Sequence, residues 1–186
     1  MLATAFVLLV IAPKSILIPP CILCGKSVYL YSIILYIDKI FKNVNIKKFS
    51  SMDELKEEDL IRSLKFYAPK RVFIECNGVS ETKKFIDKVT NSKLKEYLKL
   101  GIIVNLIDMT TFNMFLKNIP SMIIPNISLS NLIVLNKCNE ISENALKEYK
   151  DMIEKFNHNA HIVNCIGKEG TNMNFNKERL INRMMG

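Results

Sequence analysis

The chain has 186 residues, of which 49% are hydrophobic and 24% are charged, so it is long enough for one folded domain with a sizeable core. This balance excludes an intrinsically disordered protein. The net charge of +8 comes mostly from lysines that alternate with Glu and Asp, as in residues 53–58. Because no basic cluster with interleaved aromatics is present, we expect a solvated, lysine-rich surface and no nucleic-acid partner.

The five cysteines indicate a reducing compartment. Their number is odd and three of them lie in or beside apolar runs, as expected for free thiols in a cytoplasmic protein. Cys21 and Cys24 form a C-x-x-C pair, but no second pair of Cys or His follows at zinc spacing. We therefore expect neither a disulfide framework nor a zinc site.

The N-terminus is strongly apolar in residues 1–12 and again in residues 16–23. A secretory signal would begin with basic residues, whereas Lys14 follows the first apolar run. A membrane-spanning helix needs roughly 20 predominantly apolar residues. Lys14 and the Pro19-Pro20 pair interrupt this stretch, so a buried β-strand is the better interpretation.

Four short apolar runs, rich in β-branched residues, predict strands that are buried on both faces. They cover residues 71–76, 101–108, 131–136 and 160–165. Further upstream, the pattern of residues 43–49 predicts an edge strand.

Segments with helical spacing separate these runs. Residues 142–157 give the clearest pattern, and a second helix is predicted over residues 52–67 with Ser50 or Ser51 as its N-cap. Residues 28–41 predict a strongly apolar helix. The side chains expected to face inward are Leu146, Tyr149, Ile153 and Phe156 in the first helix, and Leu60, Ile61 and Leu64 in the second.

Strands that alternate with helices imply right-handed crossover connections. The sequence thus predicts an α/β fold, a three-layer, mostly parallel sheet with helices on both faces, formed by residues 1–186 as a single domain. In such sheets, ligands bind beyond the carboxyl ends of the strands. Three short motifs stand at such ends.

The first motif is Cys24-Gly25-Lys26-Ser27, just before the apolar helix. Gly25, Lys26 and Ser27 match the second half of a Walker A loop, in which backbone N–H groups and the lysine bind phosphate and the hydroxyl binds Mg²⁺. Pro20 stands where the first glycine belongs. Because proline has no N–H and a fixed φ, the loop cannot close in the usual way. The alternative is a chance match in a lysine-rich chain.

The second motif is Glu75-Cys76-Asn77-Gly78, at the end of the first apolar run. A carboxylate at this point can approach Mg²⁺ or its waters, and the glycine lets a backbone N–H come close to a terminal phosphate. The alternative is that Glu75 simply points to solvent from a strand end.

The third motif is Asn136-Lys137-Cys138-Asn139, at the end of the run 131–136. Guanine-binding proteins carry Asn-Lys-x-Asp here, where the Asp accepts two hydrogen bonds from guanine and the lysine stem lies along the base. Asn139 replaces that Asp, and an amide offers one acceptor oxygen together with an NH₂ donor. The loss of the charged acceptor would weaken the binding free energy for guanine by about 1.5–3 kcal/mol. A polar loop in an Asn-rich chain is the alternative.

Longer stretches around these motifs follow a family pattern in the same order. Residues 71–89 resemble a strand, a Glu-x-x-Gly motif and the helix after it, and residues 101–108 resemble a strand that ends in a characteristic Asp. Residues 130–137 resemble the segment A-D-hydrophobic-N-K, and residues 146–163 resemble a helix that runs into N-x-x-A-x-I. Together they resemble the CobW/HypB/UreG family of P-loop GTPases.

This resemblance implies a GTPase of the P-loop NTPase type that helps to deliver metal ions or to assemble metallocentres, with GTP and Mg²⁺ as ligands. A client metalloprotein would be its partner, and relatives tend to form a homodimer around the nucleotide. The implied roles are phosphate and Mg²⁺ binding for Gly25, Lys26 and Ser27, catalysis for Glu75 and Gly78 with Glu75 also at the metal, and base binding for Asn136, Lys137 and Asn139.

The chain also departs from the family pattern. Beside Pro20 and Asn139, the stretch between Ser27 and Arg71 is short for a switch region, and the Cys-x-Cys-Cys of the CobW branch is absent. We expect no C-terminal CobW domain. Since hydrolysis needs stabilised phosphate charge and a positioned water, we predict slow or impaired turnover.

Three functions stay open. The preferred one is a cytoplasmic, GTP-binding metallochaperone of this family, because the fold and the order of motifs are its signature. The second is a degenerate relative that does not hydrolyse nucleotide and serves as a protein-interaction module. The third, a small membrane-attached protein, rests only on the apolar N-terminus.

Overall fold

The computed structural model describes residues 4–11, 20–24, 45–49, 56–68, 71–77 and 82–166. The chain divides into two compact units, residues 5–101 and residues 102–186 with residues 1–4, so that one boundary falls inside strand β5 (Lys99–Asp108), between Gly101 and Ile102. The single-domain organisation expected from the sequence stays a prediction, as does the apolar helix over 28–41, which lies outside the described residues.

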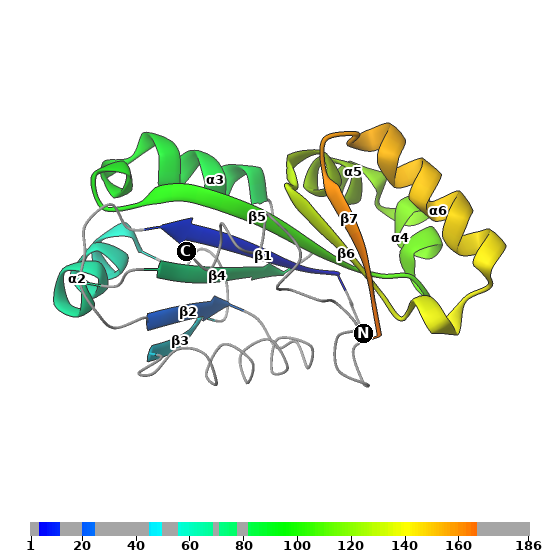
Figure 1. The fold of residues 1–186 in the computed structure, drawn as a ribbon. Coiled ribbons are helices and arrows are strands. Elements are labelled where there is room, and N and C mark those ends of the chain that lie inside the picture. Colours follow the sequence, from blue (N-terminus) through cyan, green and yellow to red (C-terminus); the bar gives the residue numbers. More distant parts are fainter. Residues whose placement is uncertain are drawn as a thin grey trace. The chain divides into compact units, whose positions relative to one another are not determined.

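The unit that ends at Gly101 contains four strands in the order β3-β2-β4-β1 (Figure 1). Strand β2 runs parallel to β3 and β4, whereas β1 pairs with β4 in the antiparallel direction. The expected N-terminal strand is therefore confirmed, and the strand expected near residues 43–49 stands at one end of the order. The bounds are β1 Thr4–Ile11, β2 Pro20–Cys24, β3 Asn45–Phe49 and β4 Arg71–Asn77.

The same unit contains helix α2 (Glu57–Tyr67), helix α3 (Thr82–Asn91) and a short 3-10 helix, η1 (Lys93–Glu96). Helices and strands both contribute apolar side chains to its core. Burial of this surface stabilises the fold by about 25 cal/mol for each Å² removed from water. Its buried hydrophobic residues include Leu60, Leu64, Val72, Ile74, Phe85, Val89, Leu94 and Leu98.

Helix α2 begins later than its periodicity predicts. Its N-cap is Lys56, which has extended backbone and makes no side-chain capping bond, so the N-cap predicted at Ser50 or Ser51 is wrong. All of the first three helical residues are acidic, and their charge stabilises the positive end of the helix dipole at this point. Leu60 and Leu64 are buried as expected, but Ile61 is only half-buried.

The unit that begins at Ile102 contains a three-stranded parallel sheet in the order β5-β6-β7. The three strands match the predicted runs, whereas the two helices between residues 109 and 130 were not predicted. The bounds are β5 Lys99–Asp108, α4 Phe112–Asn118, α5 Pro120–Leu129, β6 Leu132–Asn136, η2 Cys138–Glu140, α6 Glu143–Phe156 and β7 His161–Cys165.

Helices α4, α5 and α6 pack on one face of this sheet (Figure 1). The expected apolar face of α6 is confirmed, since Ile153 is fully buried and Leu146, Tyr149 and Phe156 pack around it. Ser142 caps the same helix by accepting a hydrogen bond from the N–H of Ala145. The buried cluster comprises Ile107, Met109, Phe112, Ile123, Ile127, Ile133, Leu135 and Ile153.

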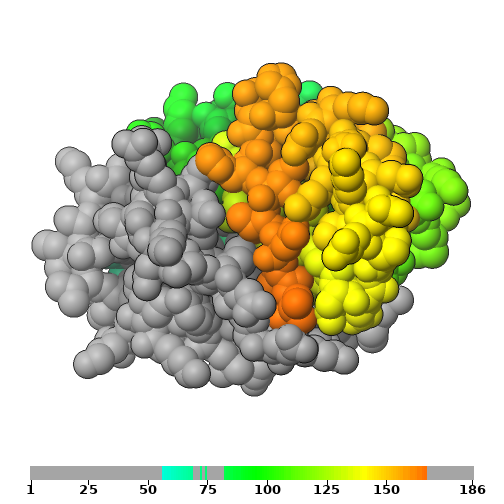
Figure 2. Space-filling view, turned by 45° about the vertical axis from the view of Figure 1, so that its right-hand side comes forward, coloured from blue at the N-terminus to red at the C-terminus, as the bar shows by residue number. Residues whose placement is uncertain are grey.

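Strand β7 is not buried on both faces, so that part of the prediction is wrong. His161 and Asn164 are exposed and only Cys165 is buried, whereas all five residues of β6 are buried. The reason is its place at the end of the order β5-β6-β7, where polar side chains can reach water. Figure 2 shows atoms from this part of the chain, in orange, at the surface.

Asn157 closes the turn between α6 and β7. Its Nδ2 donates to the backbone oxygens of Ile127 and Ser130, each at 2.8 Å, and to that of Ser128 at 3.2 Å. Its Oδ1 accepts from the N–H groups of Asn159 and Ala160, both at 3.1 Å. The N-x-x-A segment is therefore a structural clamp that satisfies backbone groups where helix α5 ends.

Among the described residues, no helix is long and apolar enough to cross a membrane.

Candidate functional site

The carboxyl ends of β5, β6 and β7 meet at one edge of the parallel sheet. The register pairs Asp108 with Asn136 and Asn136 with Cys165, so the last residues of all three strands are neighbours. Because carboxyl ends of parallel strands are where ligands bind in such folds, this edge is the candidate site.

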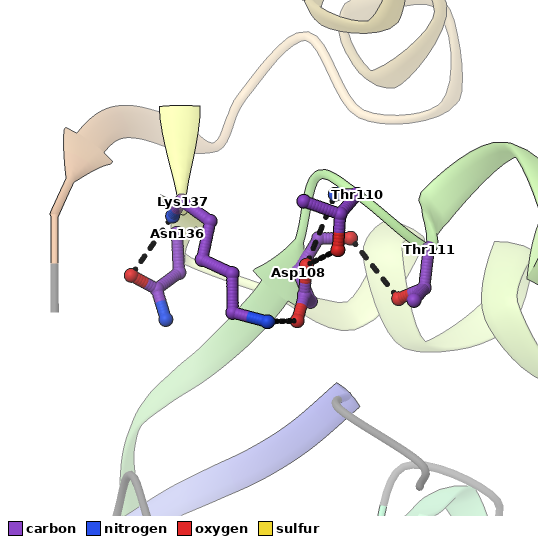
Figure 3. Close-up of polar contacts among 5 residues, drawn as sticks. All are labelled: Asp108, Thr110, Thr111, Asn136 and Lys137. Atoms are coloured by element: carbon purple, nitrogen blue, oxygen red, sulfur yellow. Dashed lines mark hydrogen bonds and ion pairs between the residues drawn. The ribbon is translucent and has the colours of Figure 1, made fainter. Parts of the chain in front are cut away.

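Asp108 is a buried carboxylate at this edge, with only 2% of the residue exposed. Its Oδ1 accepts a hydrogen bond of 3.0 Å from the N–H of Thr110 and one of 2.5 Å from the Thr110 hydroxyl (Figure 3). The main-chain oxygen of Asp108 accepts from the N–H and the hydroxyl of Thr111. The turn that follows β5 therefore holds the carboxylate in one orientation.

The second oxygen of this carboxylate binds the lysine of the third motif. The distance from Asp108 Oδ2 to Lys137 Nζ is 2.6 Å, and the Lys137 side chain is 23% exposed (Figure 3). A buried carboxylate is costly unless it is paired and hydrogen-bonded, and Lys137 and Thr110 together meet that need. The ion pair fixes the lysine beside the ends of β5 and β6.

The backbone turns sharply at Lys137, which has φ 58° and ψ 35° in the left-handed region. The side-chain Oδ1 of Asn136 accepts a 2.9 Å hydrogen bond from the Lys137 N–H. The main-chain oxygen of Asn136 accepts a 3.0 Å hydrogen bond from the N–H of Met109. Asn136 itself is 2% exposed. A left-handed non-glycine residue is strained and is often found at functional sites.

Asn139 lies in η2, just after this turn, and its side chain is exposed. The thiol of Cys138, the residue before it, donates to the Leu135 oxygen at 3.1 Å and is half-buried. The structure thus places Asn136 and Lys137 close together at the sheet edge, with Asn139 at the adjoining surface.

The remaining predicted site residues belong to the other unit. Glu75 lies in β4, in register with Leu23 of β2, and its side chain is not among those described. Gly25, Lys26, Ser27 and Gly78 lie outside the described residues. Their roles stay predictions.

Pro20 is the first residue of β2, paired with Asn45 of β3, and the strand extends to Cys24. A proline is tolerated at the first position of a strand, where its missing N–H is least disruptive. The residues between the expected glycine position and Gly25 are therefore extended and hydrogen-bonded as a strand.

Asp108 is the site residue that sequence reasoning missed. It was expected only as the last residue of a strand, although the sequence held a usable signal. Two buried runs end in Asp108 and in Asn136-Lys137, and parallel register places such ends side by side. That register brings the Asp108 carboxylate and the lysine after Asn136 to the same sheet edge.

The described residues contain no group of three or more His, Cys, Asp or Glu side chains that could hold a metal ion. A Mg²⁺ site at Ser27 and Glu75 depends on side chains outside that description.

Comparison with known proteins identifies the family. The profile of the CobW/HypB/UreG nucleotide-binding domain matches residues 44–164. The fold is similar to that of Zn(II)-bound YjiA GTPase from E. coli, with a TM-score of 0.64 and 14% identity over 90% of this chain. The chain spans 63% of the length of that structure. No curated protein matches the sequence significantly.

The structural likeness confirms the expected α/β fold of P-loop NTPase type. The matched segment begins one residue before β3 and ends in β7, so it includes both strands that end in Asp108 and Asn136. Because the profile covers well over half of the sequence, the chain belongs to the CobW/HypB/UreG family through its nucleotide-binding domain.

Proposed function

We propose that this protein binds GTP with Mg²⁺ in the cytoplasm and acts as a metallochaperone-type GTPase with slow or impaired hydrolysis. The observation that carries the proposal is the Asn136-Lys137 pair at the carboxyl end of a buried parallel strand, inside the segment that matches the family. A client metalloprotein is the proposed partner.

In this proposal, the base binds at the edge formed by the ends of β5 and β6. Asp108 neutralises the ammonium of Lys137 at 2.6 Å, so the lysine contributes its apolar stem as a surface for a planar base. Asn139 stands in the position of the family's Asp and is exposed, where it can reach a ligand from η2. Its amide offers one acceptor to guanine, together with a donor.

Phosphate binding is assigned to Gly25, Lys26 and Ser27, and the response to the terminal phosphate to Glu75 and Gly78. Strand β2 ends at Cys24, one residue before this glycine. A P-loop has the order strand, curved loop, Gly-Lys-Ser and helix, whereas here the strand runs up to the glycine, so the assignment rests on the Gly-Lys-Ser motif alone. Bound Mg²⁺ would neutralise phosphate charge, with Ser27 and Glu75 as the proposed residues near it.

The test is Mg²⁺-dependent binding of a fluorescent GTP analogue, with unlabelled GTP, ATP and XTP as competitors. We expect micromolar binding that Lys26→Ala abolishes, while Lys147→Ala, which removes an exposed lysine on α6, leaves it unchanged. The proposal fails if wild-type protein binds no nucleotide, or if the two lysine variants bind alike.

The base-binding role of Asn139 has its own test. Restoring the family's residue with Asn139→Asp should favour GTP over XTP by about 10- to 150-fold relative to wild type, the equivalent of about 1.5–3 kcal/mol. An unchanged ratio between the two nucleotides would remove Asn139 from the base site.

A non-hydrolysing protein-interaction module is the second candidate. The observation that favours it is the extended, hydrogen-bonded backbone of Pro20–Cys24, where a phosphate loop would have to curve. This candidate predicts no turnover of GTP by the purified protein, measured as release of inorganic phosphate, even where nucleotide binds. Phosphate release that Lys26→Ala abolishes would exclude it.

A further inference from the structure

Two cysteines that the proposed site does not use lie at its edge. Cys165 is the last residue of β7 and is 7% exposed, whereas Cys138 follows Lys137 and is half-buried. Both carry free thiols. The register pairs Cys165 with Asn136, which is only two residues before Cys138.

The turn after β6 directs Cys138 back toward the ends of the strands. The left-handed conformation of Lys137 starts this turn, and the Cys138 thiol reaches the Leu135 oxygen at 3.1 Å. Hydrogen-bonded strands lie about 4.8 Å apart, and disulfides join Cα atoms about 4.4–6.8 Å apart. This spacing applies to the register neighbours Cys165 and Asn136, and the turn places Cys138 two residues beyond Asn136, at the same sheet edge.

The surroundings of the two thiols differ. Burial raises the pKa of Cys138, while a backbone hydrogen bond with Cys165 and the positive charge of Lys150 act in the opposite direction. Burial also raises the pKa of Cys165, and the charge of Cys138 raises it further. Cys138 is the more accessible of the two, and nearby groups partly offset the rise in its pKa that burial causes.

We propose that Cys138 and Cys165 form a dithiol pair that a low-molecular-weight disulfide oxidises to an intramolecular disulfide. The Cys138 thiolate attacks one sulfur of the small disulfide, whose S–S bond breaks and releases one thiol. The Cys165 thiolate then attacks the Cys138 sulfur and releases the second thiol. Two protein thiols are oxidised, the small disulfide is reduced to two thiols, and the two protons leave with them.

The disulfide would join β7 to the turn that carries Lys137 and Asn139. A disulfide would remove the Cys138 S–H, and with it the hydrogen bond to the Leu135 oxygen at the start of η2. This second step rests on the proposed function, because it takes that turn as the base site. Oxidation should then weaken GTP binding about fivefold or more, and a reductant should restore it.

The first experiment maps the thiols of the full chain after incubation with oxidised glutathione. Trypsin separates Cys138, Cys165 and Cys76 into different peptides, because a lysine or arginine lies between each of them. In the wild-type protein we expect a cross-link between the peptides 138–147 and 156–168. It should persist when free thiols are alkylated and should be broken by dithiothreitol. In Cys165→Ser, a glutathione adduct on Cys138 should replace it.

The proposal is overturned if both cysteines remain alkylatable after this treatment, or if either links instead to Cys21, Cys24 or Cys76. A variant with those three cysteines changed to serine provides the matched control, since it retains only Cys138 and Cys165. The wild-type map needs no variant, so a variant that misfolds leaves the result intact.

The second experiment measures GTP affinity for reduced and oxidised protein. A loss of affinity in oxidised wild type, absent in Cys165→Ser, supports control of the base site by the dithiol. If the cross-link forms but reduced and oxidised protein bind GTP with equal affinity, the dithiol does not regulate the base site. If reduced protein binds no nucleotide, the proposed function fails, while the peptide map still decides whether the disulfide forms.

Discussion

Replacement of Asn157 by alanine should destabilise the protein strongly without touching any nucleotide. Asn157 is 8% exposed, and its two shortest hydrogen bonds, both 2.8 Å, go to the backbone oxygens of the buried residues Ile127 and Ser130. Each such bond contributes about 1–1.5 kcal/mol, and its loss leaves a buried carbonyl without that donor. We expect the free energy of unfolding to fall by about 3 kcal/mol.

The assay is urea unfolding of the full chain, followed by far-UV circular dichroism. With a slope of about 2 kcal/mol per molar urea, the unfolding midpoint should fall by about 1.5 M while the slope stays constant. Asn159→Ala is the matched control, since Asn159 is exposed at the same turn, and it should change stability by less than about 0.5 kcal/mol.

Asn157→Asp separates the hydrogen-bond argument from a loss of packing. It preserves the shape of the side chain but turns an oxygen, in place of the donating NH₂ group, toward three backbone oxygens. We expect it to cost at least as much as the alanine change. An aspartate variant as stable as wild type, or an alanine variant whose midpoint falls by less than about 0.5 M, would refute the clamp.

Three further changes test other parts of the structure by the same unfolding assay. Ala68→Gly should stabilise the protein by about 1 kcal/mol, because Ala68 ends α2 with φ 42° and ψ 53°, where glycine has no steric penalty; a loss of stability would contradict that conformation. Ser142→Ala should cost about 1 kcal/mol through loss of the N-cap of α6, and no change would mean that the cap contributes nothing. Asp108→Asn should cost about 2 kcal/mol, less than a fully buried pair because the Lys137 side chain is 23% exposed, and it should also weaken GTP binding. Unchanged stability and affinity in this variant would remove Asp108 from the site.

Much of the fold could be predicted because its signals are local. The four apolar runs became β4, β5, β6 and β7, and the helical spacing before the last of them became α6. Helices α4 and α5 gave no comparable signal. Pro125 lies inside α5, where a proline removes one helical hydrogen bond, yet Ile123 and Ile127 on the same helix are buried in the core. Tertiary packing there overrides local propensity.

The candidate site was predicted less completely. Asn136, Lys137 and Asn139 were found because they lie within four residues in a recognisable motif, and the structure places Lys137 beside Asp108. Asp108 was missed because its partner is 29 residues away in sequence, a distance at which no local pattern operates. Only strand register reveals such a pair.

The sequence by itself determined the α/β class, the strands β4 to β7 and the family pattern, because burial and backbone periodicity are properties of neighbouring residues. Tertiary structure alone decided the antiparallel direction of β1, the exposure of β7 and the ion pair between Asp108 and Lys137. Each of these depends on which strand lies beside which. A strand's own residues specify its extended form, but its neighbours decide its direction, its exposure and the charges that meet at its end.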